Sequence, residues 1–301
     1  MSSAPMPRVV VVTRASELEA LLARHGTHQQ ARFFLERRGQ ALADVERRHA
    51  LREAALGAVS RAIPVEWRRV RIDRADLSRF VFEARDLVVA VGQDGLVANA
   101  AKYLSGQPVL GVNPDPERND GVLVPHRPGS VGPLLAAMAA ERAELESGTL
   151  AEARLDDGQR LLALNEIFAG HRSHQSARYR LAFGGREERQ SSSGVIVATG
   201  TGATGWARSI NGERAHRLDL PDPADRALAF LVREPFPSIA TGTSLDGALI
   251  PTGQALVITS EMNDGGVLFG DGIEDDRLEF PFGTRAEVTP AAETLRLVRG
   301  A

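Results

Sequence analysis

The sequence predicts two domains of different fold classes: an N-terminal doubly wound α/β domain, followed by an all-β domain. In the first half, short apolar runs alternate with stretches of helical periodicity, as in an α/β layer. The runs at 8–13 (RVVVVT) and 87–91 (LVVAV) are continuously apolar, which is typical of parallel strands buried on both faces. From about residue 149, short alternating runs are separated by Gly-Gly and Asp-Gly turns, which indicates strands with little helix.

The change of pattern near residue 148 sets the predicted domain boundary. We expect the α/β domain to span residues 1–148 and the β-rich domain to span residues 149–284. The C-terminal segment, about 285–301, is expected to pack back on the first domain.

Composition limits the classes of function. The 301 residues are 43% hydrophobic and 25% charged with a net charge of -3, which gives no electrostatic case for nucleic acid or a membrane as partner. The absence of cysteine excludes disulfides and thiolate chemistry. Of 36 basic residues only Lys102 is a lysine, so no Walker A loop is present. The first eight residues lack the apolar core of a signal peptide, and we expect a cytoplasmic location.

The elements of the α/β domain can be expected in order from caps, periodicity and breakers. Before the central unit these are a strand at Arg8–Thr13, a Ser16 cap with a helix at 17–24, one long amphipathic helix or two between Thr27 and about Ala62, a stop at Pro64, a strand at Val70–Ile72 and a helix at Ala75–Ala84. After it come a loop at Pro114–Pro125 and a helix at Val131–Leu145.

The central unit is a βαβ segment. It comprises a strand at 87–91, a turn Gly92-Gln93-Asp94-Gly95, a helix at 96–104 and a strand at 109–112. Ligands of doubly wound sheets bind at the carboxyl ends of the strands, and a helix amino terminus attracts phosphate. One acid beside such a turn suggests phosphoryl transfer with Asp94 as the base. The alternative is ordinary turn chemistry, in which Asp94 only caps the helix.

The β-rich half contains a second glycine-rich stretch. Strands are expected at 160–170, 177–185, 193–199, 255–260, 265–272, 277–282, 285–290 and 294–298. After Ala198, residues 200–205 match G-x-G-x-x-G, but the segment that follows is short and lacks the acid of a dinucleotide-binding fold. The stretch offers close backbone approach, the hydroxyls of Thr199, Thr201 and Thr204, and Trp206 for stacking on a base. The alternative is a tight turn with Trp206 in the core.

Some of the other polar residues in the β-rich half are stronger candidates for a binding site than others. Asn165 and Glu166 interrupt an apolar strand, where a carboxylate suits two ribose hydroxyls and an asparagine suits an adenine edge; the alternative is a polar strand end. Asp271 in a Gly-Asp-Gly turn is a possible site residue. His171 and His174 are expected in an exposed loop, so no metal site is predicted.

These motifs, in this order, resemble the NAD kinase family. The matching pieces are GQDG at 92–95, GVN at 111–113, NE at 165–166 and TGTGATGW at 199–206. The longer stretches GVNPDPERNDG, ALNEIFAG, SSSGVIVATGTGATGWARSIN and VREPF resemble in particular the mitochondrial-type NAD kinases of animals. The resemblance covers most of the chain from about Asp86 to Asp271.

The resemblance implies an NAD kinase-like fold, in which a β-sandwich domain follows the α/β domain. It also implies phosphorylation of the adenosine ribose 2′-hydroxyl of NAD to give NADP, with ATP and Mg²⁺. It implies that Asp94 accepts the hydroxyl proton and that Gly92, Gln93 and Gly95 form the phosphate loop. It further implies a homodimer or homotetramer and a set of substrate-binding residues: Asn113, Asn165, Glu166, Thr199, Thr201, Gly202, Thr204, Gly205 and Trp206.

Two residues of the phosphate loop depart from the family pattern. Gln93 stands where the family has its second glycine, and Leu96 stands where it usually has threonine. A side chain at 93 either crowds a phosphate or donates a hydrogen bond to it. Two alternatives to the kinase therefore remain: a weak or inactive NAD-binding regulatory protein, and a kinase for a lipid or sugar hydroxyl. The phosphate donor, ATP or polyphosphate, and the preference for NAD or NADH are left open.

Overall fold

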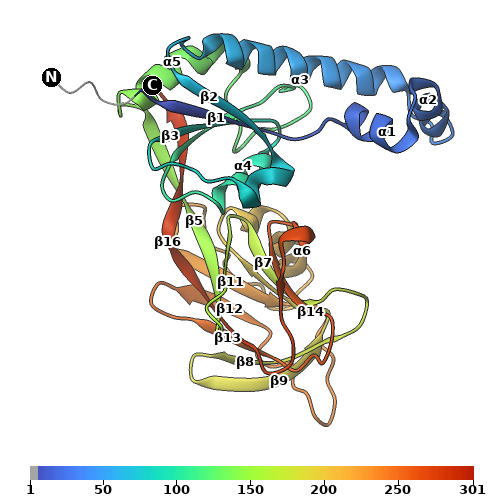
Figure 1. Cartoon of the computed structure of the whole chain (residues 1–301). Helices are drawn as coiled ribbons and strands as arrows, with labels where there is room; N and C mark the ends of the chain where they lie inside the picture. Colours follow the sequence, from blue (N-terminus) through green and yellow to red (C-terminus); the bar gives the residue numbers. More distant parts are fainter. Residues whose placement is uncertain (1–5) are drawn as a thin grey trace. The chain divides into compact units, whose positions relative to one another are not determined.

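The computed structural model describes residues 6–301, and the chain forms two compact units. The first unit contains the chain up to Ala100 together with residues 106–146 and 296–301. The second contains residues 101–105 and 147–295 (Figure 1). Five of the eight residues from which the absence of a signal peptide was predicted lie outside the described part of the chain.

A parallel sheet forms the centre of the first unit. Its order is β2-β1-β3-β4-β16, with the end of β16 pairing in parallel with β4. The strands are β1 (Arg8–Thr13), β2 (Arg68–Asp73), β3 (Asp86–Val91), β4 (Pro108–Val112) and β16 (Arg285–Gly300). Every residue of β3 is buried, as its continuous apolar run predicts. The helices α3 and α5 pack on one face, and α4 lies on the other (Figure 1). The predicted doubly wound α/β architecture is thus confirmed.

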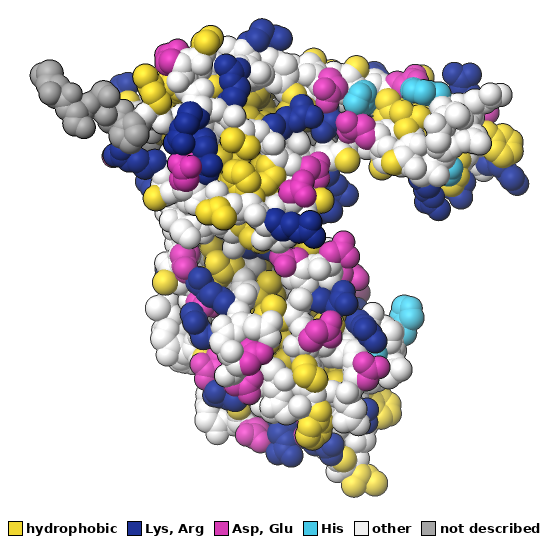
Figure 2. All heavy atoms as spheres, viewed as in Figure 1, with side chains coloured by type: hydrophobic (Ala, Val, Ile, Leu, Met, Phe, Trp, Pro, Cys, Tyr) yellow, Lys and Arg dark blue, Asp and Glu magenta, His cyan; other side chains and the backbone are white. Residues whose placement is uncertain are grey.

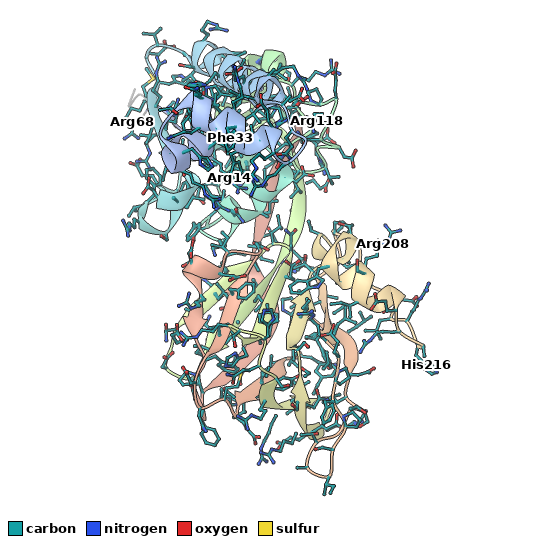
Figure 3. The ribbon with its side chains drawn as sticks, turned by 90° about the vertical axis from the view of Figure 1, so that its right-hand side faces the viewer. Arg14, Phe33, Arg68, Arg118, Arg208 and His216 are labelled. Atoms are coloured by element: carbon teal, nitrogen blue, oxygen red, sulfur yellow. The ribbon has the colours of Figure 1, made fainter. Side chains whose placement is uncertain are left out.

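Three helices open the chain. They are α1 (Glu17–His25), α2 (His28–Glu36) and α3 (Leu42–Ala62). Ser16 caps α1 through a capping box with Glu19, which confirms the predicted cap. Around α1, α2 and the start of α3, buried residues including Leu18 and Leu35 form a small core of their own. Phe33 lies on the outer surface of this group (Figure 3).

Three of the helices predicted in the first unit had wrong limits. The segment expected as a helix at 75–84 forms only a 3-10 helix, η1 (Arg74–Arg79), because Phe80 is already extended. The helix α4 spans Asp94–Ala101 and so begins two residues before the predicted start and ends three before the predicted end. After a 3-10 turn, η2 (Pro128–Ser130), the helix α5 (Val131–Ala139) stops six residues before the predicted Leu145.

The early stop of α5 has a tertiary cause. Glu141 has a positive φ of 55°, and β5 (Glu144–Leu155) begins three residues later. This strand pairs with β16 and β6, so strand pairing overrides the helix propensity of the Ala- and Glu-rich stretch.

The second unit is a β-sandwich, as predicted. One sheet has the order β12-β11-β10-β7-β14-β15, and every pairing in it is antiparallel. The facing sheet includes β5, β6, β8, β9, β13 and the first part of β16. The remaining strands are β6 (Arg160–Ala163), β7 (Glu166–His171), β8 (Ala177–Phe183), β9 (Arg186–Ser192), β10 (Val195–Ala198), β11 (Ala227–Val232), β12 (Gly247–Pro251), β13 (Leu256–Ser260), β14 (Gly266–Gly270) and β15 (Leu278–Glu279).

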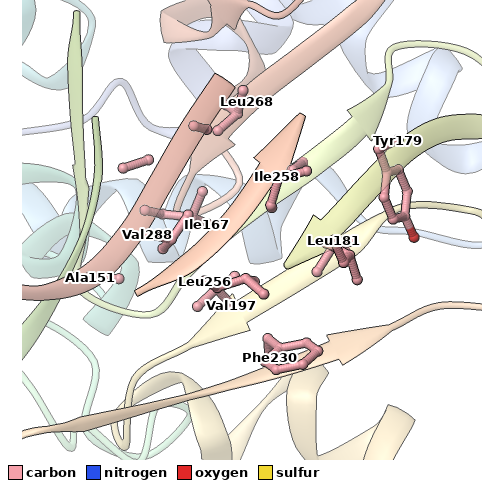
Figure 4. Close-up of a cluster of buried hydrophobic side chains, with 14 of the residues drawn as sticks. Ala151, Ile167, Tyr179, Leu181, Val197, Phe230, Leu256, Ile258, Leu268 and Val288 are labelled. Carbon is pink, nitrogen blue, oxygen red and sulfur yellow. The ribbon is translucent and has the colours of Figure 1, made fainter. Parts of the chain in front are cut away.

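The inward faces of both sheets supply the core of the sandwich. Phe230 and Ile167 come from one sheet, and Tyr179 and Ile258 come from the other (Figure 4). The strands expected at 285–290 and 294–298 form one strand, β16, and the run expected as one strand at 160–170 is two, broken at Leu164-Asn165. The strands β11 and β12 lie outside the predicted set.

The surface carries mixed charges. Basic and acidic side chains alternate over the visible face of each unit (Figure 2). Within residues 6–301, none of the helices combines the length and the apolar character needed to cross a membrane.

Candidate functional site

In the first unit, Asp94 lies at the carboxyl edge of the parallel sheet. The strand β3 ends at Val91, and Asp94 is the first residue of α4. Its Oδ1 accepts hydrogen bonds from the backbone N–H groups of Leu123 (2.8 Å) and Val124 (3.2 Å). Its Oδ2 accepts one from Val122 N–H (3.2 Å). The carboxylate therefore fixes the segment 122–124 against the amino terminus of α4.

Asn113 fixes the other end of the same loop. Its Nδ2 donates to the carbonyl oxygen of Asn119 (3.1 Å), and its Oδ1 accepts from Asp115 N–H (3.0 Å). The Gln93 side chain, next to Asp94, donates from Nε2 to Asn119 Oδ1 (3.1 Å). The predicted residues Gln93, Asp94 and Asn113 thus meet through one loop, residues 113–126.

Packing does not require the glycine at position 95, whereas at position 92 it leaves little room for a side chain. A Cβ on Gly95 would meet no heavy atom within 4 Å, and one on Gly92 would meet only the side chain of Leu96, at 3.1 Å. Among the described non-glycine residues, positive φ occurs only at Glu141, Glu234 and Asp271, so Gln93 has an ordinary backbone conformation. The open space at Gly95 leaves the backbone accessible to a ligand at that position.

In the second unit, Asp271 organises the Asn165-Glu166 pair. It follows β14 with a φ of 55°, and the pair follows the break after β6. Asp271 Oδ1 accepts from Asn165 N–H (2.6 Å) and Oδ2 accepts from Leu164 N–H (3.0 Å). Its own N–H donates to the carbonyl oxygen of Glu166 (3.0 Å). The possible site residue Asp271 is therefore part of the same cluster as the pair.

The Thr199–Gly205 stretch packs on the same pair. Thr199 N–H donates to the carbonyl oxygen of Asn165 (2.9 Å), and Thr199 Oγ1 donates to that of Leu164. Thr199 Oγ1 also accepts from Gly202 N–H (3.2 Å), and Thr204 Oγ1 donates to the carbonyl oxygen of Thr201 (3.0 Å). The hydroxyls of Thr199 and Thr204 thus hold the turn itself.

Gly202 is a glycine that packing does require. A Cβ there would collide with the carbonyl oxygen of Asn165. We therefore expect Gly202→Ala to lower the free energy of unfolding by about 1–3 kcal/mol, the usual cost of overpacking. Gly212→Ala is the matched control, because a Cβ on Gly212 meets nothing within 4 Å. Urea unfolding of both variants checks this, and equal stabilities would contradict it.

The Trp206 side chain is partly buried. It opens α6 (Trp206–Gly212) after Gly205, and its ring stacks on Phe168 with centroids 6.0 Å apart and an interplanar angle of 14°. The guanidinium of Arg233 lies 4.8 Å from the ring centroid, and 37% of the residue is exposed. Arg208 and His216 lie at the outer surface of this region (Figure 3). The partly exposed ring leaves area for a ligand.

Burial raises the proton affinity of both carboxyl groups in the cluster. The pKa of Glu166 is raised from 4.5 to about 7, first by burial and then by repulsion from Asp271. Burial also raises the pKa of Asp271 to about 6, although the hydrogen bonds from Leu164 and Asn165 and the charge of Lys102 oppose the shift. Both groups therefore change their protonation state near neutral pH.

Lys102 is a neighbour of this cluster that the motifs did not indicate. Its Nζ lies 2.7 Å from Asp276 Oδ2, and the Tyr103 hydroxyl donates to the same oxygen. Both residues follow α4 and belong to the second unit. The available sequence signal was that Lys102 is the single lysine of the chain.

His171 is the last residue of β7 and is half-buried, so its predicted place in an exposed loop was wrong. His171 Nδ1 accepts from Ser173 N–H (3.1 Å), and His174 is exposed. Within the described chain, the one group with ligand atoms within 4.8 Å of one another is Glu19, His49 and Glu53. Glu19 already closes the capping box of α1, so this group has a structural explanation.

Comparison with known proteins finds relatives that are named NAD kinase or NADH kinase. No protein-family model matches the chain. A probable NADH kinase of Oryza sativa subsp. japonica is 29% identical over 230 residues, 68% of each chain. An NAD kinase of Psychrobacter arcticus is 30% identical over 193 residues, 60% of this chain and 55% of the relative. The mitochondrial NAD kinase 2 of Rattus norvegicus is 26% identical over 263 residues, 70% of this chain and 62% of the relative.

The chain is thus similar in sequence to proteins named NAD kinase and NADH kinase. The match spans less than two thirds of the bacterial and rat relatives' own length. Solved structures of NAD kinase-family proteins share the fold. Yeast NADH kinase complexed with NADH superposes with a TM-score of 0.64 at 16% identity, covering 99% of this chain and 85% of that one. An Archaeoglobus fulgidus NAD kinase in complex with ATP gives 0.58 at 18% identity, covering 97% and 94%.

Proposed function

We propose that this protein is an NAD kinase, which transfers a phosphoryl group from ATP to the adenosine ribose 2′-hydroxyl of NAD to give NADP. The observation that carries the proposal is the cluster in which Asn165, Glu166 and Thr199 meet through Asp271 and direct hydrogen bonds. These are motif residues of the family, and hydrogen bonds join them into one cluster instead of leaving them in separate turns. The names of the relatives, NAD kinase and NADH kinase, support the same activity.

Asp94 is proposed as the base that accepts the proton of the 2′-hydroxyl. A carboxylate offers about four lone-pair sites, and backbone N–H groups occupy two at Oδ1 and one at Oδ2. A site at Oδ2 is left for a substrate hydroxyl. The three amides also hold the carboxylate in one orientation, which phosphoryl transfer requires of a group that positions a nucleophile.

We assign one binding role to the motif of each unit: phosphate binding to the GQDG turn of the first unit, and nucleoside binding to the motif residues of the second unit. We propose that the backbone of Gly92, Gln93 and Gly95 receives phosphate, aided by the open space at Gly95 and by the amino terminus of α4. Glu166 would accept hydrogen bonds from ribose hydroxyls and Asn165 would bind the adenine edge, with Trp206 stacking beside them. Mg²⁺ would enter as the complex with ATP, where it neutralises phosphate charge.

Gln93 does not argue for an inactive protein. Its φ is not positive, and its side chain donates to Asn119. The side chain therefore belongs to the loop that Asp94 also holds, so we propose an active kinase. A homodimer or homotetramer is proposed on the family resemblance alone, and light scattering tests it.

The deciding experiment measures NADP formation by the purified protein with Mg²⁺. ATP and inorganic polyphosphate are compared as donors, and NAD, NADH, a diacylglycerol and a sugar are compared as acceptors. We expect NADP or NADPH from one of the donors. Preference for the lipid or the sugar would overturn the NAD assignment. Binding of NAD by calorimetry without turnover would favour the non-catalytic alternative.

A further inference from the structure

The end of the last strand, β16, is hydrogen-bonded to the loop that holds the candidate base. His126 Nε2 donates to the carbonyl oxygen of Val298 (2.8 Å), and Arg299 Nη1 donates to the carbonyl oxygen of Val122 (2.8 Å). All four residues belong to the first unit. Both ends of the segment 122–126 are therefore attached to β16.

The guanidinium of Arg299 is itself held by Glu146. Its Nε donates to Glu146 Oε2 (2.7 Å) and its Nη2 donates to Glu146 Oε1 (3.1 Å), which makes a bidentate pair. The hydrogen bond from Arg299 lowers the pKa of Glu146, although burial opposes the shift. A partly exposed ion pair contributes little stability by itself. Its consequence here is geometric, because a planar fork fixed at two nitrogens directs the third, Nη1, at the carbonyl group of Val122.

One peptide group links Arg299 to Asp94. The carbonyl group of Val122 and the N–H group of Leu123 belong to the same planar peptide unit. Its oxygen accepts from Arg299, and its N–H donates to Asp94 Oδ1 at 2.8 Å, the shortest of the three hydrogen bonds to that carboxylate. The cation thus lies at the negative end of the peptide dipole, and the carboxylate lies at the positive end. Each hydrogen bond therefore strengthens the other.

Side-chain packing does not fix this peptide group on the Val122 side. Leu123 and Val124 are buried, whereas 62% of Val122 is exposed. The backbone at Leu123 packs against β4, where a Cβ on Gly111 would collide with the Leu123 carbonyl oxygen. Packing therefore holds the following peptide group, while the direction of the Val122 carbonyl group depends on the hydrogen bond from Arg299.

We infer that Arg299 is a positioning residue for Asp94. The guanidinium, oriented by Glu146, fixes the peptide group between Val122 and Leu123. That peptide group in turn holds the Asp94 carboxylate in one orientation, which phosphoryl transfer requires of a group that positions a nucleophile. The role of Asp94 as the base rests on the proposed function, but the hydrogen-bonded connection from Arg299 to its carboxylate does not.

Amide hydrogen exchange tests this connection without any enzymatic activity. In Arg299→Met we expect the Leu123 amide, followed by NMR, to exchange about ten-fold faster or more, because its peptide group loses a charged hydrogen-bond donor. Glu146→Gln keeps the cation but weakens its orientation, so we expect a smaller increase in this variant. The amide of Val89, in the buried strand β3, reports global unfolding and should keep its rate in both variants.

Arg296→Met is the matched control for the exchange experiment. Arg296 is exposed on the same strand and also donates to a carbonyl oxygen, that of Gly106 (3.0 Å), which lies before the start of β4. We expect the exchange of Leu123 to be unchanged in this variant. An unchanged rate in Arg299→Met, an increase that Val89 shares, or an equal increase in Arg296→Met would overturn the inference.

Kinetics separate positioning from a general structural role. We expect Arg299→Met to lower kcat about ten-fold and to change the KM for NAD by less than about three-fold, because the residues proposed to bind the nucleoside are unchanged. In an Asp94→Asn background the same substitution should lower kcat by less than about two-fold, since a positioning residue acts only through the group that it positions. An equal further loss in that background, or a defect confined to KM, would contradict the role. An inactive wild-type protein would refute only the proposed function, because the exchange of Leu123 still decides the positioning.

Discussion

Asp94→Asn is expected to lower the turnover of NAD by about 10²- to 10⁴-fold, the usual contribution of a general base, while NAD affinity stays within a few-fold. The amide oxygen of asparagine can still accept from Leu123 N–H, but it is a far weaker base than a carboxylate. The initial rate of NADP formation and the dissociation constant of NAD from calorimetry measure the two parts of this prediction.

The control for Asp94→Asn must separate chemistry from loop structure, because the Asp94 carboxylate also holds the segment 122–124. Gly121→Ala perturbs the same loop without touching the carboxylate. Gly121 has a φ of 71°, and a Cβ there would approach Asn113 Nδ2 at 2.8 Å. If Gly121→Ala loses as much turnover as Asp94→Asn, Asp94 acts by holding the loop and not as the base.

Local signals predicted much of the α/β half correctly. The run of four valines in β1 and the Ser16 cap act over a few residues, so the sequence around them is sufficient. The predicted helix at 131–145 failed because its second half is Ala- and Glu-rich but pairs with β16, a strand more than 140 residues away. Propensity is a weak prior against such pairing.

In the candidate site, too, the sequence indicated features that depend on local signals and did not indicate contacts between distant residues. Asp94, Asn165 and Glu166 were recognisable because they interrupt apolar strands or follow them directly. The donors to Asp94 are backbone amides of the segment 122–124, and any residue type except proline supplies them, so no pattern marks them. Lys102 pairs with Asp276 across more than 170 residues, and only its rarity in the composition pointed to it. The catalytic and binding roles of the site residues stay predictions until the variants are measured.

Glu166→Gln is expected to stabilise the protein at pH 8.5 by about 1–3 kcal/mol and to change its stability little at pH 5. The pKa of Glu166 is raised from 4.5 to about 7, so the folded state holds this proton more tightly than the unfolded chain. Stability from this group is therefore full below about pH 4.5 and is lost as the pH rises to about 7. The full difference corresponds to about 3 kcal/mol, and the remaining contact of Glu166 with water reduces it.

Glutamine stays neutral at every pH, so Glu166→Gln removes the cost of ionising a buried group at this position. The same substitution also removes the carboxylate proposed to bind the ribose. We therefore expect the KM for NAD to rise about ten-fold in the same variant, as is usual for the loss of a hydrogen bond to a charged group.

Glu187→Gln is the matched control, because Glu187 is exposed and pairs only loosely with Arg180 (3.4 Å). The stability of the protein should change by less than about 0.5 kcal/mol at either pH in this control. Urea unfolding at pH 5 and pH 8.5 measures the stabilities. An equal effect of Glu166→Gln at both pH values would show that Glu166 is already ionised in the folded protein at pH 5. Stability gained without any loss of NAD affinity would instead mean that its buried carboxylate serves another purpose than binding the ribose.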